Sequence, residues 1–292
     1  MPQIKLSMVG GKAEIARVHR FIEDEFDDDG LPVSFSEINE DDDLFEAALY
    51  VDSADVEQAE ARIRNRIGAD AFGLRITHET MPDIDWVAHS LDGLNPVRVG
   101  RVVVHGAHDS ATVLPNEIGI QIEAAQAFGT GHHGTTAGCL DMLQRVTKAR
   151  APRAMLDLGT GSAVLALALA RLTNRPVLAT DNDPLAITIA RDNAALNGCA
   201  HLVRFAVAEG FACDAIRRAA PFDLIVANIL AGPLMQLAPH MRSFSTIGAD
   251  VILSGILDRQ AARVQAAYVA NGFALRGQTR REGWTTLHFT RR

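Results

Sequence analysis

The sequence predicts an α/β protein made of two modules, a small α+β module followed by a larger one with a mostly parallel sheet. In the C-terminal part, β-type and helical stretches alternate at the spacing typical of parallel sheets covered by helices. The charge is also divided unevenly. The net charge is −8, whereas residues 1–90 carry 21 acidic and 8 basic side chains. Such a division indicates modules with different partners, although a solvated acidic surface also explains it.

The first module has the element order β-α-β-β-α-β. Alternating apolar residues predict strands, and apolar residues at helical spacing predict helices. The expected strands are 4–9, 33–38, 44–51 and 72–77, and the expected helices are 12–26 and the segment around Ala59, Ile63 and Ile67. This order is that of a ferredoxin-like unit, a fold that often binds proteins or RNA. We place this module at residues 1–84, a linker at 85–100 and the second module at 101–292.

The second module alternates strands and helices after a short strand at 101–104. The expected strands are 154–158, 177–181, 202–207, 222–227, 250–255, 273–279 and 284–290. The expected helices are 162–173, 184–197, 209–219, 232–244 and 258–271. Ligands of such sheets bind beyond the C-terminal ends of the strands, so the residues that follow each strand are the candidates for a binding site.

The first two of these strands each end in residues suited to a nucleoside ligand. Gly159 and Gly161 allow a tight turn and a close approach of the backbone to a ligand. Asp181 follows 20 residues later and can accept hydrogen bonds from both hydroxyls of a ribose. The alternative role for Asp181 is a helix N-cap, but Asp183 is better placed for that. Val164 stands where a dinucleotide fingerprint needs glycine or alanine, which argues against NAD.

Asn228 follows the fourth strand. A side-chain amide offers an acceptor and donors without charge, which suits the orientation of an amine nucleophile whose lone pair must stay free. The alternative is a cap for the helix expected at 232. Upstream, residues 127–136 combine glycines, hydroxyls and an aromatic side chain, as a loop over a cofactor would. His132 and His133 in that loop are adjacent and lack the spacing of zinc ligands, so no metal site is expected.

Four stretches together identify a family resemblance: AFGTGHHGTT at 127–136, LDLGTGSAVLALALA at 156–170, TDNDPLAITIARDNAALNG at 180–198 and VANILAGPLMQLAP at 226–239. They resemble the class I S-adenosylmethionine-dependent methyltransferases, most closely the ribosomal protein L11 methyltransferase family (PrmA). The resemblance implies a Rossmann-like domain with a seven-stranded, mostly parallel sheet after the ferredoxin-like one. The sequence departs from the family pattern at three positions. His132 and Gly134 replace a threonine and a proline, and Ala163 replaces a third glycine.

The resemblance also implies roles for single residues. S-adenosylmethionine would be held by Thr136, Gly159, Gly161 and Asp181. Asn228 would touch the cofactor's methyl group and the substrate amine. The N-terminal module would recognise a basic protein of the large ribosomal subunit, and the methylated groups would be its α-amine and lysine ε-amines.

Other features narrow the class of protein. Cys139, Cys199 and Cys213 are few and odd in number, which is typical of reduced thiols in a cytoplasmic protein. No run of 18 apolar residues occurs, so no membrane partner is expected, and the chemistry requires no nucleic acid. Three alternatives stay open at this point: a lysine methyltransferase acting on a different protein, a non-catalytic cofactor-binding adaptor, and an NAD-linked oxidoreductase.

Overall fold

The computed structural model of the chain describes residues 3–26, 29, 31–39, 44–67, 75–80, 96–122 and 133–292. The chain divides into two compact units, Met1–Trp86 and Val87–Arg292. The predicted boundary at 84 and most of the predicted linker lie outside the described residues.

The first unit is a four-stranded antiparallel sheet with two helices. Its elements are β1 (Gln3–Gly11), α1 (Lys12–Glu25), β2 (Val33–Asn39), β3 (Leu44–Asp52), α2 (Val56–Ile67) and β4 (Ile76–Thr80). The strand order is β2-β3-β1-β4, with antiparallel pairing throughout. The element order and this pairing are those of the expected ferredoxin-like unit.

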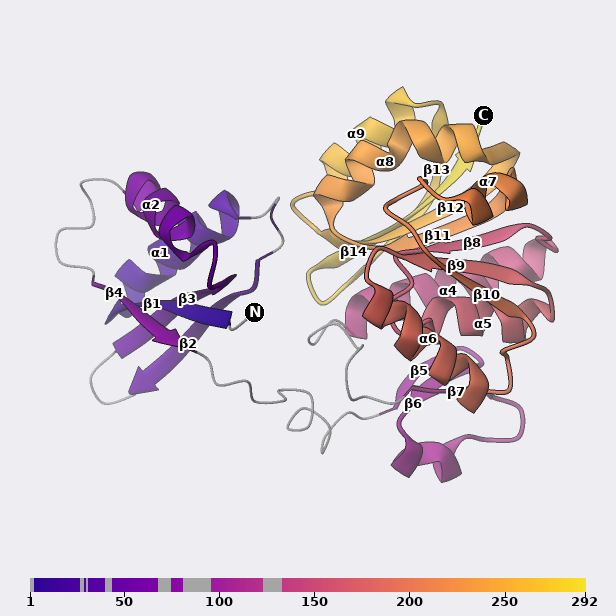
Figure 1. Ribbon diagram of the computed structural model, residues 1–292, viewed down its shortest axis with the longest axis horizontal. Helices are drawn as coiled ribbons and strands as arrows, with labels where there is room; N and C mark the ends of the chain where they lie inside the picture. The colour runs from indigo at the N-terminus through magenta and orange to yellow at the C-terminus, as the bar shows by residue number, and fades with distance from the viewer. Residues whose placement is uncertain are drawn as a thin grey trace. The chain divides into compact units, whose positions relative to one another are not determined.

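Both helices cover the same face of this sheet (Figure 1). Leu6 and Met8 alternate along β1 and are fully buried, as are Ile15 and Ile22 on one side of α1. Strand side chains that face one side of a sheet repeat every two residues, and helical side chains on one face repeat every three to four. The buried residues follow these two repeats, and they pack together in a single core. β4 begins at Ile76, later than the strand predicted at 72–77, of which residues 72–74 lie outside the described ranges.

The second unit contains a seven-stranded sheet. Its strands are β8 (Met155–Leu158), β9 (Val177–Asp181), β10 (Val203–Val207), β11 (Phe222–Asn228), β12 (Ser245–Leu257), β13 (Phe273–Arg281) and β14 (Trp284–Arg291). Their order is β10-β9-β8-β11-β12-β14-β13, and β14 runs antiparallel to both of its neighbours while the other pairs are parallel. The Rossmann-like, mostly parallel sheet implied by the sequence is confirmed.

Helices cover both faces of this sheet (Figure 1). They are α4 (His133–Ala149), α5 (Val164–Thr173), α6 (Pro184–Leu196), α7 (Asp214–Ala219), α8 (Ala231–Phe244) and α9 (Ala261–Ala270). Buried residues of α4, α5 and α6 form one apolar core, and those of α7, α8 and α9 form another on the opposite face. The strands between are apolar on both sides, as a doubly covered parallel sheet requires.

A small three-stranded sheet precedes α4. It consists of β5 (Val97–Val99), β6 (Val102–His105) and β7 (Ile118–Gln121), with a 3-10 helix, η2 (Ala107–Thr112), between the last two. β6 is the strand expected at 101–104. β5 corrects the predicted linker, because residues 97–99 pair with β6 and belong to the second unit.

Five elements of the second unit differ from the predicted bounds by two residues or more. α9 begins at Ala261 and not at 258, and β13 ends at Arg281 and not at 279. α5 begins at Val164 and not at 162, and α7 begins at Asp214 and not at 209, because Gly210 turns the chain with a φ of +53°. β12 is longer than the predicted 250–255, since it follows α8 without an intervening loop.

Candidate active site

The predicted site residues lie at the point where the strand order reverses. β8 is flanked by β9 on one side and β11 on the other, and Leu158 is in register with Thr180 and Ala227. The three strands are parallel, so the residues that follow them emerge at the same edge of the sheet. Ligands of open α/β sheets bind at such a switch point.

Two adjoining cavities open at this edge. The first has a volume of about 350 Å³ and is lined by Thr135, Thr136, Gly159, Thr160, Gly161, Ser162, Val164, Leu165, Asn228, Ile229, Leu230, Gly255 and Trp284. The second, of about 930 Å³, shares Gly159, Ile229 and Leu230 with the first and includes Asp181. The structure therefore brings together all five residues that the sequence analysis selected, four in the first cavity and Asp181 in the second.

The glycine turn after β8 is shaped by left-handed backbone. Gly159 has a φ of +73° and Gly161 a φ of +53°. The amides of Gly159 and Thr160 donate to the carbonyl of Thr180, at 2.8 and 2.9 Å, which fixes the turn against β9. A Cβ on Gly159 would lie 2.3 Å from Cγ2 of Ile229, so a larger residue would displace a side chain that lines both cavities.

Ala163 adopts the backbone conformation that suits the glycine it replaces. It is the N-cap of α5, with a φ of +68°, and its side chain is fully buried. A left-handed L-residue costs roughly 1–2 kcal/mol, while burial of one methyl group returns about 0.8 kcal/mol. Burial offsets part of the cost, and the turn keeps its left-handed conformation with alanine at this position.

Asp181 supports the glycine turn with its carboxylate. Oδ2 accepts from the amide of Gly161 at 2.8 Å, and Oδ1 accepts from the amide of Asp183 at 3.1 Å. The N-cap of α6 is Asp183, whose carboxylate accepts from the amide of Leu185 at 2.8 Å. The capping alternative for Asp181 is therefore wrong. Each carboxylate oxygen can accept a further hydrogen bond, as a ribose diol requires.

Asn228 ends β11 and is half-buried. Its Nδ2 donates to Oγ1 of Thr135, at 3.3 Å, in the first turn of α4. α8 begins at Ala231 with Leu230 as its N-cap, and no side chain caps that end. The alternative in which Asn228 caps the helix is contradicted. With one N–H of the amide bound to Thr135, the amide oxygen is the acceptor available to a ligand in the cavity.

Thr135, Gly255 and Trp284 are three of the residues that line the first cavity and that the sequence analysis did not select. Thr135 neighbours the selected Thr136, and its role follows only from its contact with Asn228. Gly255 has a φ of +79°, and a Cβ there would lie 2.3 Å from the carbonyl oxygen of Ile229. Trp284 begins β14, far from the recognisable stretches. A glycine inside an apolar strand often marks a close approach of another backbone, which was a usable signal for Gly255, whereas Trp284 carried none.

The departures near α4 are partly explained. A Cβ on Gly134 would lie 2.9 Å from the carbonyl oxygen of Arg281, in the β13–β14 hairpin. A proline at this position would carry that Cβ, so glycine fits the close approach of the hairpin. His132 lies outside the described residues, as does the rest of the loop from 127 to 131.

Asp157 is a buried carboxyl group beneath the glycine turn. Its Oδ2 accepts from Oγ1 of Thr160 at 2.6 Å and from the amide of Ala166 at 3.0 Å. Its Oδ1 has no partner among the described residues. Burial raises the pKa of Asp157 to about 7, with a smaller contribution from the charge of Asp181, and the two hydrogen bonds offset only part of this. The carboxyl group ties the turn to the start of α5.

Comparison with known proteins identifies the family. The model of the family described as ribosomal protein L11 methyltransferase (PrmA) matches residues 21–292. The chain belongs to the ribosomal protein L11 methyltransferase family. It is 50% identical over 288 residues to the ribosomal protein L11 methyltransferase of Mesorhizobium japonicum, covering 99% of both chains. It is 49% identical over 290 residues to that of Brucella abortus, covering 99% of this chain and 100% of the relative.

A solved structure agrees with this assignment. The ribosomal protein L11 methylase of Lactobacillus delbrueckii subsp. bulgaricus matches with a TM-score of 0.61 and 29% identity, covering 68% of this chain and 100% of that one. The enzyme class and the cofactor expected from the sequence, a methyltransferase that uses S-adenosylmethionine, are confirmed by this membership of the PrmA family. The adaptor and oxidoreductase alternatives do not fit it.

The cavities fit this cofactor. Gly159 and Gly161 form a cradle that a Cβ at Gly159 would obstruct, and Asp181 offers acceptors beside it. No cluster of three or more histidine, cysteine or acidic side chains suited to a metal ion occurs among the described residues. Within the same parts of the chain, no helix has both the length and the apolar composition needed to cross a membrane.

Proposed function

We propose that the protein transfers methyl groups from S-adenosylmethionine to the α-amine and lysine ε-amines of ribosomal protein L11, a basic protein of the large ribosomal subunit. The observation that supports this best is the uncharged amide of Asn228 at the open end of β11, held by Thr135 beside the glycine turn. The names of relatives 49–50% identical over nearly the whole chain support the choice of substrate.

In this proposal the first cavity receives the methionine part of the cofactor and the second receives its ribose. Thr136, Gly159 and Gly161 bind the methionine part, and Asp181 accepts from the ribose hydroxyls. Bound there, the cofactor supplies a methyl group on a positively charged sulfur. The protein's own task is to aim a nucleophile at that group, since positioning provides much of the rate of an in-line displacement.

Asn228 has the chemistry to aim an amine. Its amide nitrogen is bound to Thr135, so its oxygen accepts an N–H from the substrate and directs the lone pair toward the methyl group. An amide does this without a charge that would favour the ammonium form, which cannot attack. Asn228 also borders the methionine part of the cofactor, so it contributes to cofactor binding.

The amine must lose a proton before it reacts. At pH 7.5 this costs about 4 kcal/mol for a lysine and well under 1 kcal/mol for an α-amine. Among the described residues that line the first cavity, none has an ionisable side chain, and Val164, Leu165 and Trp284 present apolar surface. Burial in such surroundings disfavours the ammonium and lowers this cost.

Residues 1–84 form the part that recruits the substrate. They hold most of the acidic residues of the chain, which attract a basic ribosomal protein and repel nucleic acid. In this proposal the enzyme acts in the cytoplasm on the protein itself, with neither nucleic acid nor membrane as a partner.

Mass spectrometry of purified large-subunit proteins, incubated with the enzyme and S-adenosylmethionine, tests the proposal. We expect mass increases in multiples of one methyl group on ribosomal protein L11, at its α-amine and at lysines. Methylation of another protein and not of L11 would overturn the proposed substrate but would support the proposed methyl transfer to an amine. No transfer to any of these proteins would overturn the proposal.

A further inference from the structure

A chain of buried hydroxyl groups between α4 and the sheet leads from β14 to the active site. Ser254 on β12 donates from Oγ to the carbonyl oxygen of Thr135 at 3.3 Å. The Ser254 and Thr286 hydroxyls lie 2.9 Å apart, with Thr286 on β14. All three residues are buried. Through Thr135 the chain reaches Asn228, whose amide donates to the Thr135 hydroxyl.

The hydroxyl protons of Ser254 and Thr286 can be assigned in one way that satisfies both of the contacts that Ser254 makes with Thr135 and Thr286. Ser254 has a single proton, and its bond to the Thr135 carbonyl uses it. The Thr286 hydroxyl must then donate to Ser254. Ser254 is therefore the point at which α4, β12 and β14 are joined by polar contacts.

These hydroxyl groups lie in the interface between α4 and the sheet, where apolar side chains would be buried at a lower cost in free energy. A buried hydroxyl group without a partner costs roughly 1–3 kcal/mol, so its retention between a helix and a sheet requires satisfied bonds. α4 also approaches β14 closely, since a Cβ on Gly138 would lie 2.2 Å from Oγ1 of Thr286. The close approach and the hydrogen bonds both fix the first turn of α4 against the sheet.

We propose that Ser254 and Thr286 are positioning residues for methyl transfer. They hold Thr135 in place, and Thr135 in turn holds the amide of Asn228 so that its oxygen faces the substrate amine. Neither residue lines the first cavity, and both act through Thr135. This inference rests on the catalytic role proposed for Asn228.

Three variants of the full-length enzyme test the inference. Ser254→Ala removes the bond to the Thr135 carbonyl, and Thr286→Val replaces a hydroxyl group by a methyl group of similar size. We expect single-turnover rates at saturating cofactor to fall about tenfold in both, because a misplaced reacting group commonly costs that much or more. Affinity for S-adenosylhomocysteine should fall by a smaller factor than the rate, because Asn228 is only one of the residues that border the cofactor. Thr286→Ser keeps the hydroxyl group and should restore most of the rate.

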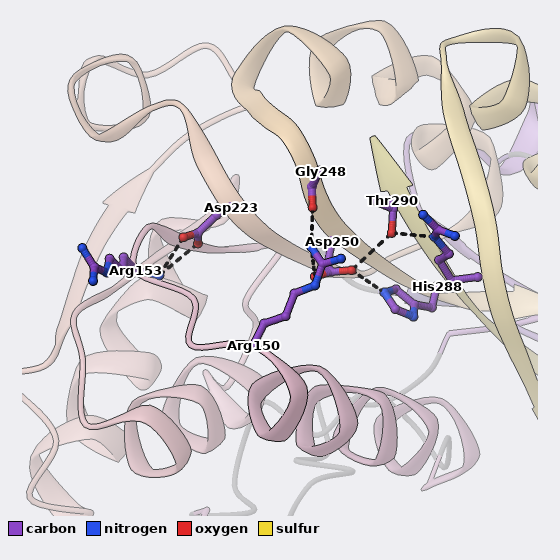
Figure 2. Close-up of polar contacts among 8 residues, drawn as sticks. Arg150, Arg153, Asp223, Gly248, Asp250, His288 and Thr290 are labelled. Carbon is purple, nitrogen blue, oxygen red and sulfur yellow. Dashed lines mark hydrogen bonds and ion pairs between the residues drawn. The ribbon is translucent and has the colours of Figure 1, made fainter. Parts of the chain in front are cut away.

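Thr290→Val is the matched control, because it makes the same exchange four residues further along β14. The Thr290 hydroxyl is buried and lies between Asp250 and Arg276, at 3.3 and 3.1 Å. Figure 2 shows its contact with Asp250, with which Thr290 is in register. Thr290 lines neither of the two cavities. We expect this variant to lose stability without losing rate. Equal rate losses in Thr290→Val and Thr286→Val would show a general packing effect and overturn the inference.

A double-mutant cycle separates failure of this inference from failure of the proposed function. In an Asn228→Ala background, Ser254→Ala should cause no further loss of rate, since both changes act on the same group. Additive losses would overturn the positioning role. A normal rate in Asn228→Ala alone would instead remove the catalytic role of Asn228. If the Asn228→Ala variant has a reduced rate and the Ser254→Ala variant has the wild-type rate, the inference is overturned and the proposed function stands.

Discussion

The amide of Asn228 and the hydroxyl of Thr135 are hydrogen-bonded at 3.3 Å although they stand 93 residues apart in the chain. The contact joins the end of β11 to the first turn of α4. It fixes which end of the amide faces the cavity, because the nitrogen is bound to Thr135. The amide oxygen is thereby presented to an amine, and a carboxylate in its place would present a charge.

Replacement of Asn228 tests its role in turnover. We expect Asn228→Ala and Asn228→Asp each to lower the single-turnover rate at saturating cofactor by about tenfold or more. The alanine cannot orient the amine, and the aspartate favours its unreactive ammonium form. The aspartate variant should recover part of its rate as the pH rises. Thermal unfolding measured alongside distinguishes loss of fold, and a normal rate in the folded variants would defeat the assignment.

The carboxylate of Asp181 should matter for cofactor binding. Asp181→Ala removes acceptors for the ribose and for the amide of Gly161, so affinity for S-adenosylhomocysteine should fall by about 1.5–3 kcal/mol. Asp183→Ala is the control, two residues away. It removes the N-cap of α6, which should cost about 1 kcal/mol of stability without changing the affinity. Isothermal titration measures both, and equal affinities would exclude Asp181 from the site.

The sequence predicts this site in part, for a clear physical reason. Asp181 and Asn228 end apolar strands, and in a parallel sheet the ends of neighbouring strands meet at one edge. Pattern reasoning therefore finds them without knowledge of any contact. The strand 177–181 is predicted with its observed bounds, because Asp181 and Asp183 mark its end and the start of α6.

The residues that escape prediction depend on contacts that no local pattern encodes. Ser254 reaches Thr135 across 119 residues, and Trp284 reaches the cavity from the last hairpin. β12 escapes in part for a local reason. Its first residues include Gly248, and a glycine at that place in the sequence predicts a turn. In the structure Gly248 has a φ of +80°, and β12 continues through it.

Removal of the first unit should separate cofactor binding from substrate recruitment. A fragment of residues 87–292 retains β5 and its pairing with β6, which a start at 101 would remove. We expect the fragment to bind S-adenosylhomocysteine as the full chain does and to lose activity on the ribosomal protein. Full activity of the fragment would sink the proposal that residues 1–84 recruit the substrate.

The buried carboxyl group of Asp157 should make stability depend on pH in an unusual direction. Burial raises its pKa from 3.8 to about 7, so between these values the folded protein keeps a proton that the unfolded chain releases. Stability from this group is fully present below pH 3.8, falls as the pH rises toward 7, and stays at its lower level above. Most paired carboxylates show the opposite trend.

The variant Asp157→Asn isolates this contribution. The asparagine oxygen can still accept from Thr160 and from the amide of Ala166, but the side chain no longer titrates. We expect the stability of the wild type relative to the variant to decrease between pH 4.5 and pH 7.5 by about 3 kcal/mol at most. Urea unfolding of both proteins at these two pH values measures the difference. A constant difference would mean that Asp157 titrates alike in the folded and unfolded chains, and an increase with pH would mean that its hydrogen bonds outweigh its burial.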